Sequence, residues 1–267
     1  MSWFQALILG IIQGLTEFLP VSSSGHLTIG QTLLGVEFAD GDMLFFDVLV
    51  HAATVCSTLL VLWKEVAWIM KGTFTTPAWN AEKQYAGKII LSMVPVFIVG
   101  MFFKDQVEAI FGHGIVVVGV CLILTACLLT FAHYAKPRTK EQIGWWDSLI
   151  IGIGQACAVL PGLSRSGTTI ATGLILGNKK EQVAQFSFLM VLVPILGETF
   201  LNILDILQGE VVTDLTWTVM LVGFVSPFVV GAAACKWMIA IVKRQKLIYF
   251  AIYCLLMGGF ALCYGLC

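Results

Sequence analysis

Six apolar stretches, each close to the length that crosses a bilayer, constrain the fold of this chain more than any other feature of its sequence. They fall at about 43–62, 85–103, 113–135, 183–205, 215–242 and 247–266. A transmembrane helix needs about 20 residues of this kind. The 267 residues are 58% hydrophobic and only 12% charged, too apolar for the surface of a soluble domain. The sequence therefore predicts an all-α integral membrane protein with six transmembrane helices in a single domain, residues 1–267.

Charged residues are divided unequally between the two sides of the predicted bundle. Because basic residues mark the cytoplasmic side, the acidic loops are expected to face outward. The basic side carries Lys64, Lys71, Lys83, Lys88, Lys136, Arg138, Lys140, Lys179, Lys180, Lys243, Arg244 and Lys246. The acidic side keeps Lys104 but collects Glu37, Asp40, Asp42, Asp105, Glu108, Glu210 and Asp214. The segment 64–88 is the longest polar connection, and we expect its Thr-Phe-Thr-Thr-Pro-Ala-Trp run, residues 73–79, to form a cytoplasmic surface loop.

A polar motif occurs twice in apolar surroundings. Residues 1–35 and 143–177 align without a gap and share eleven identities, including a Gln-x8-Ser-x-Ser-Gly frame that begins at Gln13 and again at Gln155. Duplicated and interrupted hydrophobic segments indicate the central site of a membrane protein built from repeats. The halves of the repeat are expected at approximately 1–142 and 143–267.

A proline followed by small polar residues interrupts each copy of the motif, at Pro20 and at Pro161. Each copy also begins and ends on the same side of the predicted topology. We interpret each as a helix, a break and a second helix that form a re-entrant hairpin, the first entering from outside and the second from the cytoplasm. This is an inverted-topology repeat whose breaks meet near the middle of the membrane. One proline-kinked span for each copy is the alternative.

Ionisable side chains at membrane depth are costly and therefore indicate function. Glu17, His26 and Arg165 occur within the repeated frame, with Gln13 one helical turn before Glu17. A helix that restarts after each proline would present hydroxyls, free backbone N–H groups and its positive dipole end, which together suit a phosphate. The residues expected to bind such a group are Gln13, Ser22, Ser24, Ser164, Ser166, Gly167, Thr168 and Thr169.

The remaining polar residues suggest catalytic roles. Arg165 is suited to hold a phosphate, and His26 to transfer protons near neutral pH. Glu17 is suited to orient or deprotonate a nucleophile, or to ligate a divalent cation. Ser23 is a candidate nucleophile, with attack by water as the alternative. A plain structural pair of Glu17 with Arg165, and serines that only cap helices, remain competing interpretations.

Three further polar residues have no settled assignment from the sequence. Asp47 and His51 lie four positions apart on the span that follows the first copy of the motif, and a functional role for them stays open. Glu198 is an acid inside a predicted span, and the sequence does not indicate its purpose.

These motifs resemble those of the undecaprenyl-diphosphate phosphatase family, the integral membrane type linked to bacitracin resistance. The family's first motif is matched from Gln13 to His26, its second from Pro161 to Thr169, and the Phe-Ser-Phe-Leu run at 186–189 also agrees. The resemblance covers essentially the whole chain. Many members have Glu where this chain has Gln13, which weakens any cation site built on two carboxylates.

The resemblance implies hydrolysis of undecaprenyl diphosphate to undecaprenyl phosphate and inorganic phosphate, which recycles a lipid carrier for bacterial cell-wall synthesis. It also implies that Glu17, Ser23, His26 and Arg165 are catalytic residues. The implied cofactor is Mg²⁺ or Ca²⁺, with Glu17 as the metal ligand. The expected location is the bacterial plasma membrane, with the site opening to the outer face. The expected partners are the polyprenyl diphosphate substrate and membrane lipids, and binding of nucleic acid is not expected. Whether the protein forms a homodimer is left open.

Transport is the competing function, because inverted repeats with broken helices are also the architecture of alternating access. A polyprenyl-phosphate transporter or flippase would need the same anion site. Only hydrolysis needs a positioned nucleophile and a proton donor, so the set Glu17, Ser23 and His26 favours the enzyme.

Overall fold

The computed structural model describes residues 1–38, 41–75, 77–103, 106, 109, 114–135, 140, 142–207, 213–243 and 247–266. Within these residues the fold consists of helices, and β-type pairing is limited to an isolated bridge between Lys140 and Asn178. The helices are α1 (Trp3–Phe18), α2 (Ser23–Leu33), α3 (Asp42–Val61), α4 (Trp63–Thr75), α5 (Ala81–Phe102), α7 (Gly114–Tyr134), α8 (Trp145–Cys157), α9 (Arg165–Ile175), α10 (Lys180–Leu207), α11 (Trp217–Lys243) and α12 (Leu247–Leu266).

Six of these helices are long and apolar enough to cross a membrane, and they coincide with the six predicted spans. They are α3, α5, α7, α10, α11 and α12. The agreement follows from the length and composition of each stretch, which are local properties of the sequence. The protein is therefore an all-α, multi-pass membrane protein, as predicted.

Both copies of the repeated motif fold as a helix, a break and a second helix. Helix α1 packs against α2, and α8 packs against α9. At 16, 11, 13 and 11 residues, these four helices fall short of the roughly 20 that a span needs. The predicted order of helix, break and helix is thus observed in each copy, whereas the re-entrant hairpin that enters the membrane from one side stays a prediction.

The surface loop expected at residues 73–79 is shorter than predicted, because residues 73–75 are still helical, as is most of the polar segment around them. Helix α4 occupies Trp63–Thr75, and α5 already begins at Ala81. Val66 and Ile69, three positions apart on α4, pack against the main hydrophobic cluster. Apolar spacing of this kind is the pattern of an amphipathic helix, and it was hidden among the charged residues of the segment.

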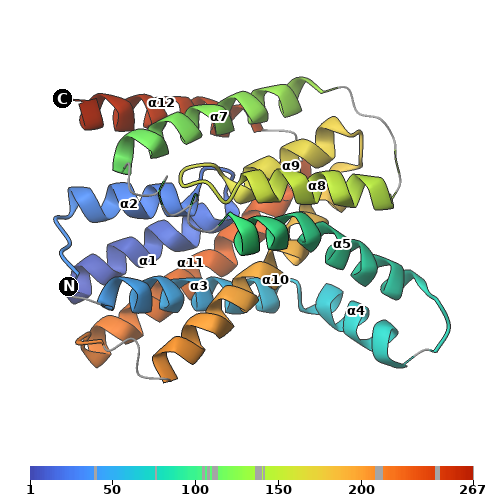
Figure 1. The fold of residues 1–267 in the computed structure, drawn as a ribbon, viewed down its shortest axis with the longest axis horizontal. Helices are drawn as coiled ribbons and strands as arrows, with labels where there is room; N and C mark the ends of the chain where they lie inside the picture. The colour runs from blue at the N-terminus through green and yellow to red at the C-terminus, as the bar shows by residue number, and fades with distance from the viewer. Residues whose placement is uncertain are drawn as a thin grey trace.

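The two hairpins are held by helices from the opposite half of the chain. Helix α1 packs mainly on α11, α8 packs on α5, and α7 lies along α12 (Figure 1). Small residues allow these close approaches. A Cβ placed on Gly258 of α12 would lie 2.8 Å from the carbonyl oxygen of Gly119 in α7. Because lipid provides little hydrophobic drive between helices, such close van der Waals contact is what holds a membrane bundle together.

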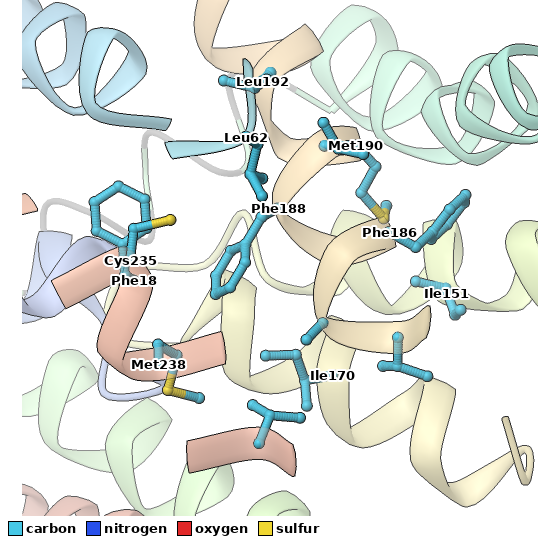
Figure 2. Packing of buried hydrophobic residues seen from close by; sticks show 14 of the residues in the cluster. Phe18, Leu62, Ile151, Ile170, Phe186, Phe188, Met190, Leu192, Cys235 and Met238 are labelled. Atoms are coloured by element: carbon cyan, nitrogen blue, oxygen red, sulfur yellow. The ribbon is translucent and has the colours of Figure 1, made fainter. Parts of the chain in front are cut away.

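The largest cluster of buried apolar side chains joins α10 to both hairpins and to α11 (Figure 2). Phe188 of α10 meets Phe18 at the end of α1 edge to face, with ring centroids 5.9 Å apart. Met238 and Cys235 of α11 are fully buried in the same cluster. This packing fixes the end of α1 in position, directly beside the break that follows it.

Several residues that the sequence singled out lie outside the described part of the chain. Among the charged loop residues these are Asp40, Lys104, Asp105, Glu108, Lys136, Arg138, Glu210, Arg244 and Lys246, and the side chains of Glu198 and Lys243 are likewise outside it.

Candidate active site

The first break, residues 19–22, stops α1 at a proline and restarts the chain as α2. Ser22 caps α2: its Oγ accepts a hydrogen bond of 3.3 Å from the backbone N–H of Gly25. Ser22 has φ +71°, and no other described residue except glycine has a positive φ. Such a conformation costs about 1–3 kcal/mol and is found where function requires it. The rest of the fold therefore holds the first break in a conformation that is locally unfavourable.

The second break, residues 158–164, restarts the chain as α9 in the same way. Ser164 Oγ accepts a hydrogen bond of 3.1 Å from the N–H of Gly167, and the N–H of Ser164 donates to Thr125 Oγ1 of α7 at 3.0 Å. Here a glycine, Gly162 with φ +88°, adopts the positive φ. The first serine of the repeated frame therefore caps a helix in each copy. The predicted restart of a helix after each proline is confirmed.

The two breaks are in direct contact. Ser166 Oγ of the second hairpin donates a hydrogen bond of 3.2 Å to the carbonyl oxygen of Leu19 in the first. A Cβ placed on Gly25 would lie 3.1 Å from Cα of Gly162, and one on Gly167 would lie 3.2 Å from Cβ of Pro20. The predicted meeting of the breaks is therefore confirmed, and the glycines of the repeated frame permit it.

A cavity of about 40 Å³ lies between the two breaks and is lined mainly by hydroxyl groups. Of the predicted site residues it collects Glu17, Ser22, Ser23, Ser24, Ser164, Arg165 and Ser166. Phe18, Phe188 and Ile195 form part of an apolar wall that limits access of water. A carboxylate, a guanidinium and hydroxyls therefore face one small space, with two helix N-termini beside it.

Glu17 is the acceptor at the centre of the polar contacts in this cavity. Its side chain is 7% exposed, and its Oε2 accepts hydrogen bonds from Ser23 Oγ at 2.6 Å and from Gln13 Nε2 at 3.1 Å. Arg165 is close enough to attract the carboxylate electrostatically. The short bond from Ser23 is the geometry of a hydroxyl nucleophile beside its general base.

His26 lies behind the first break and does not line the cavity. Its Nδ1 lies 2.8 Å from the carbonyl oxygen of Ser22, and its Nε2 lies 2.8 Å from the hydroxyl of Tyr253 in α12. Because a carbonyl only accepts, Nδ1 carries the hydrogen, and in a neutral ring Nε2 accepts from Tyr253. The structure thus makes His26 a support for the strained Ser22, while its role in proton transfer stays a prediction.

The other predicted site residues stand around the cavity. Gln13 is buried and orients Glu17, and Gly167 supplies the N–H that Ser164 caps. Thr169 Oγ1 donates to the carbonyl oxygen of Arg165 at 2.9 Å. Thr168 Oγ1 is buried without a hydrogen-bond partner among the described residues. These residues shape the breaks without lining the cavity themselves.

The structure adds site residues that the motifs did not contain. Thr54 and Thr58 of α3 line the cavity, and His51 of the same helix places Nε2 4.0 Å from Glu17 Oε2. With Asp47 they form a polar stripe on α3 at spacings of three and four residues. This spacing was the available signal, because polar residues on one face of an apolar helix mark a face turned away from lipid.

Comparisons with known proteins place this chain among membrane phosphatases. The family described as "Bacitracin resistance protein BacA" matches residues 6–260. A protein of Parabacteroides distasonis named undecaprenyl-diphosphatase is 60% identical over 259 residues, which cover 97% of this chain and 96% of that protein. Proteins of the same name from Bacteroides fragilis and Methanobrevibacter smithii are 59% and 36% identical, each over 97% of this chain and 96% of the relative.

Proposed function

Because this chain belongs to the bacitracin resistance protein BacA family, we infer that it is an undecaprenyl-diphosphatase, which hydrolyses undecaprenyl diphosphate to undecaprenyl phosphate and inorganic phosphate. The observation that supports this most directly is the hydrogen bond of 2.6 Å from Ser23 Oγ to Glu17 Oε2 beside Arg165. A transporter would need the anion site but would have no use for a hydroxyl held against a buried base. Resistance to bacitracin follows from the family assignment.

Ser23 is the nucleophile in the mechanism that we propose. Its Oγ forms a bond to the terminal phosphorus while its proton passes to Glu17, which is already its hydrogen-bond acceptor. The bond from that phosphorus to the bridging oxygen breaks, and undecaprenyl phosphate leaves. Water then attacks the phosphoserine, and the bond to Oγ breaks as Glu17 returns the proton to it. The proton that water releases leaves with the inorganic phosphate.

Arg165 and the two helix N-termini hold the terminal phosphate during this reaction. Ser23 and Arg165 are the first residues of α2 and α9, where backbone N–H groups and the helix dipole favour an anion. A guanidinium adds a planar fork of donors whose charge does not depend on pH. This arrangement offsets the negative charge that develops on the phosphoryl oxygens.

A divalent cation, Mg²⁺ or Ca²⁺, is part of the proposal and would be held by Glu17. The described residues contain no group of three or more His, Cys, Asp or Glu side chains that could hold a metal ion. Among these residues Glu17 is the one carboxylate that lines the cavity, so a cation there would share it with substrate phosphates, which is how Mg²⁺ is commonly bound. The cation would supply Lewis-acid stabilisation of the diphosphate. Gln13 cannot add a second carboxylate.

The lipid substrate and the orientation in the membrane belong to the same proposal. A polyprenyl diphosphate would keep its chain in the bilayer and place its headgroup in the cavity. The excess of lysine and arginine at one end of the bundle indicates that this end is cytoplasmic, and membership of the family supports a cavity that opens to the opposite, outer face of the plasma membrane. Lipid transport and self-association remain predictions.

Phosphate release by the purified protein from a polyprenyl diphosphate in detergent tests the proposed chemistry. Glu17→Gln removes the base while keeping the size of the side chain, and Glu37→Gln, at an exposed acid beyond the first hairpin, is the matched control. We expect the first variant to lose turnover by about 10²-fold or more and the control to retain it. Equal turnover in both would refute Glu17 as the base.

A further inference from the structure

A second cavity, of about 590 Å³, lies between α4, α5 and α10, away from both breaks. Residues at helical spacing line it from each of the three helices, so one face of every helix is turned toward it. Helix α4 contains no buried residue, and α4 and the start of α5 project from the rest of the bundle (Figure 1). The packing of α4 therefore leaves room for a ligand in the α4–α5–α10 cavity.

Lys88 lines this cavity and contributes a positive charge to its wall. The residue is 9% exposed, and its Nζ lies 5.9 Å from the ring centroid of Trp145. Within the described part of the chain, no carboxylate lies within ion-pair distance of Lys88. The ring of Trp145 is a weak partner for the ammonium group, and a positive charge in the wall of a cleft attracts an anion. The cavity therefore offers a binding position for an anion beside Lys88.

Another part of the cavity wall has the opposite character. Glu65 of α4 is half-buried, and its Oε1 accepts a hydrogen bond of 3.3 Å from Gln185 of α10. Trp68 and Tyr85 lie beside it, with ring centroids 5.9 Å apart in an edge-to-face arrangement, and Trp79 completes the aromatic lining. A carboxylate next to aromatic rings is a site for an organic ammonium group.

The residues around the cavity are of the kinds that gather at the depth of lipid headgroups. Trp68, Trp79 and Trp145 are 44%, 67% and 41% exposed, and tryptophan gathers at the membrane–water interface. Lys64, Lys71 and Lys83 belong to the same end of the bundle. Negative phosphates of lipids are concentrated at this level, beside the cytoplasmic ends of the helices.

We propose that the α4–α5–α10 cavity binds the headgroup of a zwitterionic phospholipid that bears an amine, with its phosphate on Lys88 and its ammonium group against Glu65 and the aromatic side chains. The acyl chains would extend into the bilayer beside α4 and α5. This lipid site is separate from the hydrolytic cavity, and it fills the space that the packing of α4 leaves open.

Lipid binding by the purified, delipidated full-length protein tests the proposal. Native mass spectrometry would follow titration with phosphatidylethanolamine, with phosphatidylglycerol, which has the phosphate but no amine, and with a polyprenyl phosphate. We expect wild type to retain phosphatidylethanolamine most tightly. Lys88→Gln should weaken binding of phosphatidylethanolamine by about tenfold or more, since a charge-assisted contact is lost. Lys88→Arg should restore much of the affinity.

The controls separate the proposed site from general attraction of lipid to a basic surface. Lys71→Gln removes an exposed lysine of α4 that does not line the cavity, and it should bind lipid as wild type does. Glu65→Gln should abolish the preference for phosphatidylethanolamine over phosphatidylglycerol. Because Glu65 is only half-buried, this second variant still tests the site if Lys88→Gln fails to fold. Phosphate release reports the integrity of the hydrolytic cavity in each variant.

Two results would overturn the assignment. Equal lipid affinity in Lys88→Gln and Lys71→Gln would mean that Lys88 only extends its amine toward the interface. A polyprenyl phosphate that binds more tightly than phosphatidylethanolamine, with no effect of Glu65→Gln, would identify the cavity as a site for the product and refute the amine-bearing ligand. Neither result would bear on the hydrolytic role of Glu17.

Discussion

The Nε2 atom of His26 lies 2.8 Å from the hydroxyl oxygen of Tyr253, although 227 positions separate the two residues in the chain. The two rings are stacked, with centroids 5.5 Å apart and planes inclined by 14°. Through Nδ1 the same imidazole bonds the carbonyl oxygen of Ser22, the strained cap of α2. The C-terminal helix thus holds the first break in place through one histidine.

Tyr253→Phe should destabilise the protein by about 1 kcal/mol, because it removes the hydrogen bond to His26 and little else. Turnover should fall with smaller change in KM, since Tyr253 acts on the break and not on the bound phosphate. Thermal unfolding in detergent and steady-state phosphate release measure the two effects. Tyr249→Phe, at a tyrosine of α12 that is 65% exposed, is the control. Identical unfolding temperatures and turnover in the two variants would show that the contact between Tyr253 and His26 contributes to neither stability nor activity.

Gly25→Ala should lower turnover by about tenfold or more, because small displacements of reacting groups are costly. The added Cβ would meet Cα of Gly162 at 3.1 Å, so one break must move away from the other. Gly259→Ala places its Cβ where nothing lies within 4 Å, and it should retain activity and gain slight helix stability. Wild-type kinetics in Gly25→Ala would argue that the breaks need not touch.

Ser23→Ala should reduce turnover by about 10²-fold or more if Ser23 is the nucleophile. Ser24→Ala is the matched comparison, because Ser24 lines the same cavity without a hydrogen bond to Glu17, and its effect should be much smaller. Rapid quenching with radiolabelled substrate should capture a phosphoserine in wild type. Substantial turnover in Ser23→Ala would instead assign the attack to water.

Arg165→Ala should raise KM and lower kcat together, the latter by about 10²-fold, since the same guanidinium holds the phosphate in the ground state and in the transition state. Arg165→Lys keeps the charge but loses the planar fork, so intermediate values are expected. Steady-state kinetics on a polyprenyl diphosphate provide both constants. Full turnover in Arg165→Ala would rule out the phosphate-binding role.

Gln13→Glu should increase the affinity of the free protein for Mg²⁺ or Ca²⁺, because it places a second carboxylate beside Glu17. Gln13 Nε2 is 3.1 Å from Glu17 Oε2, so two carboxylates there would repel each other until a cation binds. The thermal shift on adding the cation, measured without substrate, should therefore be larger in the variant than in wild type. Equal shifts would place any cation elsewhere.

The helices of this protein were largely predictable, and the composition of the site was predictable in part. Seven of the predicted site residues line one cavity, because the repeated frame fixes six of them at the restart of α2 and of α9 and Glu17 lies at the end of α1 beside the first break. Helix α4 in the polar segment 64–88 was not predicted, since the charged residues there obscured the apolar spacing of Val66 and Ile69. Tyr253 and Thr125 could not be assigned, because a tyrosine or threonine in an apolar helix is ordinary until its neighbours are known.

By itself the sequence determined the six spans, the two broken segments and the chemistry available at each break, since length, hydropathy and helix-breaking residues act locally along the chain. The tertiary structure decided which of those groups face one another. It turned Ser23 toward Glu17, placed His51 beside them from α3, and turned His26 away from the cavity toward Tyr253. These relationships depend on helix packing between residues far apart in the chain, and such packing leaves no local pattern from which it can be read.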